Sequence, residues 1–384
     1  MKILFAADMS FNYFTTFPGK EKAYAAMAEA AGLFQQADFS MINLENILGD
    51  RTEGEPIVKS GPNLIAEDAF AEYVYALQPD IIGMANNHSK DFGESMMYHT
   101  MQMLGEAGYT CIGAGRNLEE AYQPAKVSKN GVKAAIIAVC ENEFGVAGEQ
   151  ESGTAGYRLG MVTKAIKAAL SEGAKPIIYF HGGNEHNPFP SPGKVELYRH
   201  FIDIGAEAVI AMHTHCPQGY EYYNDKPIVY SMGNFFFPKE NKSKAWYHGY
   251  ISELDISEDK TVLTIHPYRF DYDGIMILEG RDKEAFMQYI EALNQPIQDP
   301  QKLSAYFDSW CAVSGYTGRL AGLDQEIFAD GHTQELKKIK NLLCCEAHNE
   351  LLKNAMLLLF NAKKQTSEAG MDDIRKLQNM EGFV

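Results

Sequence analysis

Two histidines follow the end of one strongly apolar segment of this chain. Residues 209–212, Val-Ile-Ala-Met, predict a buried strand, and His213 and His215 come shortly after it. Four other strand-like segments also end in side chains that can bind a metal ion, and their final residues are Asp8, 43–45, 86–88 and His181. Since an α/β sheet binds ligands where its strands end, we expect these groups to meet in one polar crevice.

Each of these groups also has a simpler interpretation. Asp8 suits a loop cap, Glu45 suits a solvated turn, and a single His181 or His215 is more often a hydrogen-bonded structural histidine than a ligand. Residues 86–88, Asn-Asn-His, are harder to explain in this way, because polar groups after a buried strand need partners. Five strand ends of this kind in one chain favour a shared metal site.

The mixture of side chains indicates which ions the crevice would hold. Carboxylate, amide and imidazole groups suit one or two divalent ions of manganese, zinc or iron. The six cysteines include no Cys-x-x-Cys pair, so we expect reduced, mostly buried thiols and no structural zinc site. A carboxylate between two ions can bridge them, and the pair can activate water against a phosphoryl group. Hydrolysis of a phosphate ester is therefore the predicted chemistry.

The segments between the strand ends predict the elements that position them. Apolar residues recur at helical spacing in five stretches, each followed by a further strand: 21–37, 66–77, 94–107, 161–171 and 194–204. This alternation is typical of a sheet covered by helices. Four strands then follow one another, at 220–223, 228–232, 250–256 and 261–268. Their short turns suggest antiparallel pairing, so we expect a second, mixed or antiparallel sheet packed on the first.

The C-terminal part of the chain is predicted to be helical throughout. Residues 282–293, 300–313 and 334–364 carry apolar side chains every three or four residues, with the leucines of 342–359 on one broad stripe. This stripe favours a bundle that packs on the domain or forms a homodimer. We therefore predict one domain over 1–275 and a helical region over 280–384.

Composition and charge exclude some classes of partner. The 384 residues are 46% apolar, as in a globular protein with a large core, and the net charge of −17 argues against nucleic acid or an anionic membrane as the main partner. Neither a signal-peptide core nor an apolar run long enough to span a bilayer is visible, so we expect a cytoplasmic protein without a membrane span.

The motifs at the strand ends resemble those of one known family. The segments are Asp8, Asn43-Leu-Glu45, Asn86-Asn-His88-Ser-Lys-Asp91-Phe-Gly93, His181-Gly-Gly-Asn-Glu185, His213-Thr-His215 and Tyr230-Ser-Met-Gly-Asn234-Phe. In this order they resemble the poly-gamma-glutamate capsule biosynthesis proteins of the CapA type, over about residues 1 to 270. The resemblance implies a metallophosphoesterase-like four-layer α/β/β/α sandwich, to which this chain adds a C-terminal all-helical extension.

The resemblance also implies roles for individual residues. It assigns metal ligands to Asp8, Glu45, Asn87, His181, His213 and His215. His88 matches the histidine that protonates the leaving group or steadies the transition state, and Asp91 can accept its second ring proton. Asp91 could instead cap a helix that starts near Gly93. Ser10 stands where the fold class usually has a ligand histidine, which leaves one ligand fewer for the first metal position.

Further polar residues are predicted to line the crevice. The expected substrate contacts are Ser10, Asn43, Asn86, Glu185, Ser231 and Asn234. Glu185 and His186 lie in a loop long enough to cover the crevice, and Asn234 could instead be a turn residue.

Two functions are compatible with this pattern. The first is a metal-dependent phosphatase or phosphodiesterase that acts on a soluble phosphorylated compound or on an intermediate of an envelope polymer such as polyglutamate. The second is a non-catalytic polymer-binding or assembly subunit with a degenerate metal site. Ser10 favours the second function, whereas the intact histidines favour the first.

Overall fold

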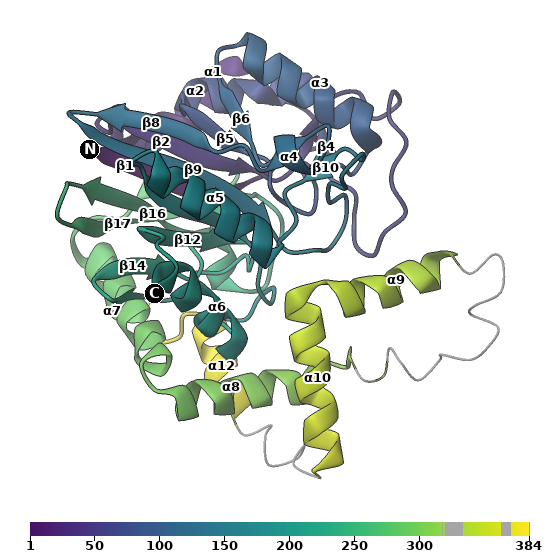
Figure 1. Cartoon of the computed structure of the whole chain (residues 1–384), viewed down its shortest axis with the longest axis vertical. Coiled ribbons are helices and arrows are strands. Elements are labelled where there is room, and N and C mark those ends of the chain that lie inside the picture. The colour runs from purple at the N-terminus through teal and green to yellow at the C-terminus, as the bar shows by residue number, and fades with distance from the viewer. Residues whose placement is uncertain (317, 319–332, 362–369, 384) are drawn as a thin grey trace.

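The fold is built on two sheets that pack face to face, in a computed structural model that describes residues 1–316, 318, 333–361 and 370–383 (Figure 1). The strands of the first sheet, in spatial order, are β18 (Ile275–Ile277), β17 (Thr261–Phe270), β16 (His248–Ile256), β1 (Lys2–Met9), β2 (Phe39–Leu44), β5 (Ile81–Gly83) and β6 (Thr110–Ile112), with β15 (Asn234–Phe236) beside β1. Those of the second are β13 (Tyr220–Tyr223), β14 (Lys226–Val229), β12 (Ala208–Met212), β11 (Lys175–His181), β9 (Val132–Cys140) and β8 (Ala125–Lys129).

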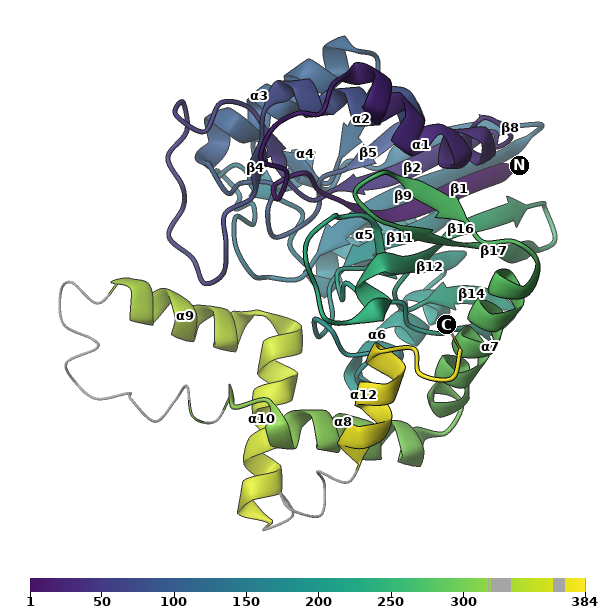
Figure 2. The same cartoon turned by 180° about the vertical axis from the view of Figure 1, so that it is seen from behind.

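Helices cover the outer face of each sheet. The first sheet carries α1 (Lys20–Phe34), α2 (Ala71–Leu77) and α3 (Gly93–Glu106), and the second carries α5 (Leu159–Ser171) and α6 (Pro192–Asp203) (Figure 2). Between the sheets, the Tyr179 hydroxyl donates to the Ala6 carbonyl at 2.5 Å, and the rings of Tyr179 and Phe5 lie 5.9 Å apart. This arrangement confirms the four-layer α/β/β/α sandwich expected from the sequence.

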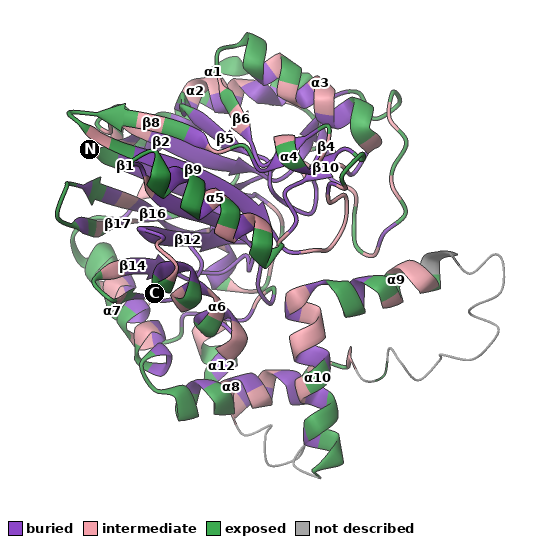
Figure 3. Ribbon diagram, in the orientation of Figure 1, coloured by how far each residue is buried: buried purple, intermediate pink, exposed green. Residues whose placement is uncertain are grey.

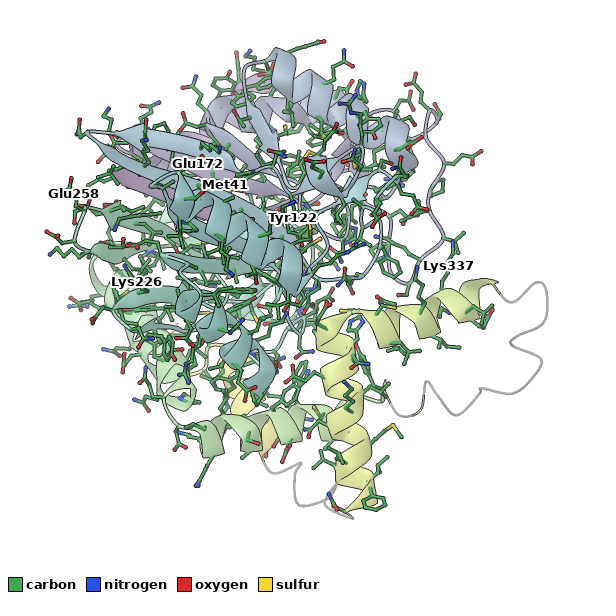
Figure 4. The ribbon with its side chains drawn as sticks, viewed as in Figure 1. Met41, Tyr122, Glu172, Lys226, Glu258 and Lys337 are labelled. Carbon is green, nitrogen blue, oxygen red and sulfur yellow. The ribbon has the colours of Figure 1, made fainter. Side chains whose placement is uncertain are left out.

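The core lies in the strands, as the burial pattern shows (Figure 3). Met41 is buried within the layers, whereas Glu258 is exposed in the turn between β16 and β17 (Figure 4). The central strands of each sheet run parallel to one another, from β1 through β2 and β5 to β6, and from β9 through β11 and β12 to β14. Their carboxyl ends therefore meet at one edge of the sandwich.

The prediction about the second sheet is confirmed in part: a second, mixed sheet packs on the first, and the late strands pair antiparallel within hairpins. The late strands do not form a second sheet of their own. Strands β13 and β14 pair as a hairpin and extend the second sheet beside β12, whereas β16, β17 and β18 extend the first sheet beside β1. Each hairpin is placed by the unpaired edge of a parallel strand, which sequence periodicity does not reveal. Strand β1 consequently pairs with β2 on one side and with β16, some 250 residues later, on the other.

Short elements complete the sandwich. Two-stranded ladders join β3 (Ile47–Leu48) to β4 (Ile65–Ala66) and β7 (Ala114–Gly115) to β10 (Gly153–Thr154), and α4 (Leu118–Ala121) packs on β7. The helix predicted from residue 66 begins only at Ala71, because 65–66 pair as β4 and a 3₁₀ turn covers Asp68–Phe70.

The helical extension begins with α7 (Gly280–Ile297) and α8 (Pro300–Val313), close to the predicted ranges. Residues 334–364 do not form one helix, since α9 (Thr333–Cys344) and α10 (Glu346–Phe360) are separated by extended backbone at Cys345, and 362–364 lie outside the described residues. The predicted leucine stripe is split as well, because Leu342 and Leu351 are buried but Leu343 and Leu357 are exposed. A last helix, α12 (Met371–Gln378), contacts α8.

The extension packs beside the second sheet, and in both views α9 projects away from the sandwich (Figures 1 and 2). Its division from the rest of the chain as a separate domain, and a homodimer through its helices, remain predictions. None of the helices among the described residues is both long and apolar enough to cross a bilayer. All six cysteines are unpaired, as predicted, although Cys344 is exposed.

Candidate metal centre

Two clusters of metal-binding side chains lie at the edge where the parallel strands end. Glu45, His181 and His213 place ligand atoms within 4.8 Å of one another, and so do Asp8, Glu45 and His215. Glu45 belongs to both clusters: its Oε1 lies 3.3 Å from His181 Nε2 and 4.0 Å from His215 Nε2. A carboxylate shared in this way is suited to bridge two cations.

The strands position these side chains directly. Asp8 lies near the end of β1 and is paired in register with Asn43 on β2, and Glu45 follows β2. The two histidines come from the second sheet: His181 is the last residue of β11, and His213 follows the neighbouring strand β12. The backbone N–H of His213 donates to Asp8 Oδ2 at 3.0 Å, so one hydrogen bond joins the two sheets at the site.

Several buried polar atoms at this edge have no hydrogen-bond partner among the described residues. They are both carboxylate oxygens of Glu45, His181 Nε2, His213 Nδ1, Asn87 Oδ1 and Ser10 Oγ. Burying such an atom without a partner costs on the order of 1–3 kcal/mol. The presence of several such atoms at one place therefore requires an explanation. Divalent ions would satisfy the carboxylate, imidazole and amide atoms together, and the residues present therefore fit one or two such ions.

Burial shifts the protonation equilibria of these side chains. Burial raises the pKa of Asp8 to about 7, although hydrogen bonds from Asn43 and His213 oppose the shift. Burial and then the charge of Asp8 raise the pKa of Glu45 well above its usual value. Burial also lowers the pKa of His215 to about 4, so its imidazole is neutral at pH 7, the form that binds metal.

The loop that carries the two histidines has an unusual backbone. His213 has φ 100° and His215 has φ 56°, in the left-handed region that costs about 1–3 kcal/mol for a residue with a Cβ. Hydrogen bonds hold this conformation: besides the bond from His213 to Asp8, the His215 ring Nδ1 lies 2.8 Å from Asn234 Oδ1. Asn234 is the first residue of β15 and orients the imidazole, so it is not a turn residue.

His88 lies beside the clusters with its own partners. Its Nδ1 is 2.6 Å from Asp91 Oδ2 and 3.0 Å from Lys59 Nζ, and Lys59 also pairs with Asp91 Oδ1 at 2.5 Å. The shorter contact to the carboxylate favours the tautomer with its proton on Nδ1, which leaves Nε2 for a ligand. The capping alternative for Asp91 is wrong, since α3 has Phe92 at its N-cap and no side-chain cap.

The sequence of this chain matches that of a known protein family. The family model described as "Bacterial capsule synthesis protein PGA_cap" matches residues 8–239. The chain belongs to this family. Among curated relatives, the "Capsule biosynthesis protein CapA" of Bacillus anthracis is 26% identical over 163 residues, and the "PGA biosynthesis protein CapA" of Bacillus subtilis (strain 168) is 28% identical over 160. These matches cover 41% of this chain.

A third relative of this PGA_cap protein is the "Probable polyglutamine synthesis accessory protein" of Mycobacterium tuberculosis, 27% identical over 216 residues and 51% of this chain. The matched parts make up 40%, 42% and 55% of the three relatives, so the chain spans about half of their length or less. A solved 5′-nucleotidase from Candida albicans is 9% identical with a TM-score of 0.40, covering 79% of this chain and 55% of the other.

The substrate contacts predicted for this PGA_cap protein lie in different environments. Asn86 is fully buried, donates to Asn43 Oδ1 and to the Leu44 carbonyl, and accepts from the His88 N–H. Ser231 is also fully buried and bonds the Thr214 hydroxyl. The structure thus gives Asn43, Asn86, Ser231 and Asn234 partners within the protein. Ser10 lies at the clusters, and Glu185 is exposed beside His88 in the wall of one cavity.

Sequence reasoning missed Lys59. It lies in the loop between β3 and β4, where a single lysine in a stretch rich in glycine and proline normally indicates a solvated residue. Its ammonium group is instead buried against Asp91, with side-chain exposures of 2% and 0%. No pattern in the sequence signals this, because the partner Asp91 lies 32 residues later, in the turn before α3.

Replacing Lys59 by methionine should lower the free energy of unfolding by about 3 kcal/mol, because it leaves the buried Asp91 carboxylate without its cationic partner. Urea unfolding followed by circular dichroism measures this change. Lys20→Met is the matched control, since the Lys20–Glu72 pair is largely exposed and its loss should leave stability nearly unchanged. Equal effects of the two substitutions would contradict a buried ion pair at Lys59.

Proposed function

We propose that this PGA_cap protein is a metal-dependent phosphoester hydrolase that acts in the synthesis of a capsule-type polymer. The observation that carries the proposal is the position of Glu45 between two ligand clusters, with both of its oxygens buried and without a hydrogen-bond partner among the described residues. His181, His213 and Glu45 would hold one ion, and Asp8, Glu45 and His215 the other. Manganese, zinc and iron suit these ligands.

Such ions supply Lewis acidity, which activates water and neutralises charge on phosphoryl oxygens. The protein's own residues supply the proton and the positioning. His88 directs Nε2 away from Asp91, and in its imidazolium form it can donate a proton to the leaving oxygen. Asp91 stabilises that form, while burial and then the charge of Lys59 lower the pKa of His88. Asp91 and Lys59 together therefore set both the tautomer and the acidity of His88.

The substrate would enter a cavity of about 450 Å³ that is lined by His88, Glu185 and Asn87 on one side and by residues of α8 and α10 on the other, including Trp310 and His348. This volume suits a small phosphorylated compound or one end of a polymer intermediate. The names of the relatives support a polyglutamate-type polymer as the pathway. The helical extension would then contribute to substrate selection.

The test is an assay of the full chain loaded with Mn²⁺ against a generic aryl phosphate mono- or diester. We expect metal-dependent turnover in the wild type and its loss in His213→Ala, because His213 is a ligand in the proposal. Turnover that persists unchanged in His213→Ala would show that the activity arises elsewhere.

A non-catalytic polymer-binding or assembly subunit is the second candidate. It is favoured by Ser10, whose buried hydroxyl lies where the fold class usually has a ligand histidine and has no hydrogen-bond partner among the described residues. Metal analysis of protein purified without added ions separates the two functions. Absence of bound metal, together with absence of turnover after manganese is added, would favour the binding subunit.

A further inference from the structure

A third group of metal-binding side chains lies outside the two clusters that share Glu45. Glu143 follows β9, and Cys345 and His348 lie at the start of α10, some 200 residues later. Their ligand atoms all lie within 4.8 Å of one another. The group combines a thiol, an imidazole and a carboxylate, whereas the other two clusters contain no sulfur.

Contacts made by neighbouring residues hold the start of α10 close to the segment that follows β9. Cys345 is the N-cap of α10, and His348 follows three residues later on the same side of the helix. The Glu346 carboxylate accepts from the backbone N–H of Asn142 at 3.0 Å and from its side-chain amide at 2.6 Å. These bonds hold the start of α10 against the segment that carries Glu143. The three side chains are therefore brought together by the fold and do not depend on one another for their placement.

Direct interactions within the group are weak. Glu143 Oε1 lies 3.6 Å from His348 Nε2, longer than a hydrogen bond. Cys345 is 1% exposed, and its thiol donates a weak hydrogen bond to a carboxylate oxygen of Glu141 at 3.6 Å. A buried thiol between two carboxylates is unfavourable as a thiolate unless a cation is present. The ligand atoms of Glu143, Cys345 and His348 are thus close enough to share a cation without being tied to one another by hydrogen bonds.

Asn341 provides an independent sign of a ligand. It is 5% exposed, its Oδ1 has no hydrogen-bond partner among the described residues, and its Nδ2 lies 3.2 Å from His348 Nδ1. A half-turn of the terminal amide places Oδ1 instead of Nδ2 against His348 Nδ1. Oδ1 would then accept a hydrogen bond from the Nδ1–H, and the lone pair of Nε2 would face the cation. This is the usual support for a histidine ligand.

We propose that Glu143, Cys345 and His348 bind a divalent ion of the zinc type, which ties α10 to the loop after β9. Thiolate and imidazole ligands favour zinc over manganese, and three protein ligands leave a fourth coordination position open. The site lies in the wall of the 450 Å³ cavity, because both Glu143 and His348 line it. The sequence shows only Cys-x-x-His here, with the third side chain far away, so the group could not be found by ligand spacing.

The ion would also support the neighbouring centre. Glu143 Oε2 accepts a hydrogen bond from Asn87 Nδ2 at 2.5 Å, and Asn87 Oδ1 has no hydrogen-bond partner among the described residues. A cation on the other oxygen of Glu143 would fix this carboxylate and thereby the orientation of Asn87. Glu143 acts here as a positioning residue.

The test is titration of the metal-free full chain with Co²⁺, followed by absorption. A cobalt ion bound to a thiolate gives a sulfur-to-cobalt charge-transfer band in the near ultraviolet, which the sulfur-free clusters around Glu45 cannot give. We expect the band to saturate in the wild type at the intensity of one thiolate-bound cobalt per chain, to disappear in Cys345→Ala and to weaken in His348→Ala. Cys344→Ala, which removes the exposed neighbour, should retain the band, and so should Glu45→Gln.

A folded wild type that shows no such band at saturating Co²⁺ would overturn the proposal, whatever the variants do. Loss of the band in Cys344→Ala with retention in Cys345→Ala would overturn it as well. The result is independent of phosphoester hydrolysis, because the band reports sulfur coordination alone. Zinc content measured on the same proteins should fall by one ion per chain in Cys345→Ala and stay unchanged in Cys344→Ala.

Discussion

Glu45→Gln should remove hydrolysis of an aryl phosphate almost completely, with a fall in kcat/KM of about 1,000-fold or more. The substitution keeps the size of the side chain but takes away the one carboxylate shared by both ligand clusters. Loss of several kcal/mol of charge stabilisation corresponds to a rate loss of this size, since each 1.36 kcal/mol is about tenfold. The measurements are turnover of Mn²⁺-loaded protein and metal content per chain, which should fall together.

Glu55→Gln is the matched control, because Glu55 is exposed in the loop between β3 and β4. It should leave turnover and metal content unchanged. The metal-free Glu45→Gln protein should be at least as stable as the metal-free wild type, since the neutral amide relieves the burial of charge beside Asp8. A variant that keeps both its ions and its rate would rule out Glu45 as the bridging group.

His88→Ala should lower kcat by about 100- to 10,000-fold, the range for loss of a general acid. Its metal content should stay that of the wild type, because His88 belongs to neither cluster. The loss should be larger for alkyl than for aryl phosphates, since a poor leaving group needs the proton more. In the wild type, the rate should fall as pH rises through the pKa of His88, which burial and Lys59 place below the usual value of about 6.5.

His99→Ala serves as the control, because His99 lies on α3 and pairs with Asp68 at the surface. It should change neither kcat nor its pH dependence. Equal losses for alkyl and aryl substrates in His88→Ala would instead indicate that His88 stabilises the transition state by its charge and does not transfer a proton.

The part of the site that could be predicted from the sequence is the part built from parallel strand ends. Asp8, Glu45, His181 and His213 each follow an apolar run of strand length, and parallel strands bring their carboxyl ends together whatever the loops do. The structure brings these four side chains within reach of one another, although their role as ligands remains a proposal. The four-layer fold was expected from the resemblance to the CapA-type proteins, since strand and helix patterns alone predicted only a sheet covered by helices with a second sheet packed on it.

What the sequence does not reveal depends on contacts between distant segments. Lys59 resembles an ordinary loop lysine because its partner Asp91 comes from another segment, and the proximity of Cys345 to Glu143 is hidden because Glu143 lies 202 positions earlier. The break between α9 and α10 is equally invisible, since the leucine pattern continues through it. Local periodicity reports which face of an element is apolar and does not report what covers it.

The place of β1 has a consequence for how the chain is made. The antiparallel neighbour of this strand, β16, is synthesised about 250 residues after it. At a translation rate of about 5–20 residues per second, one edge of β1 stays without its neighbour for more than ten seconds. Nascent chains should therefore need protection by a chaperone until β16 emerges, and a protein interrupted before residue 248 should aggregate.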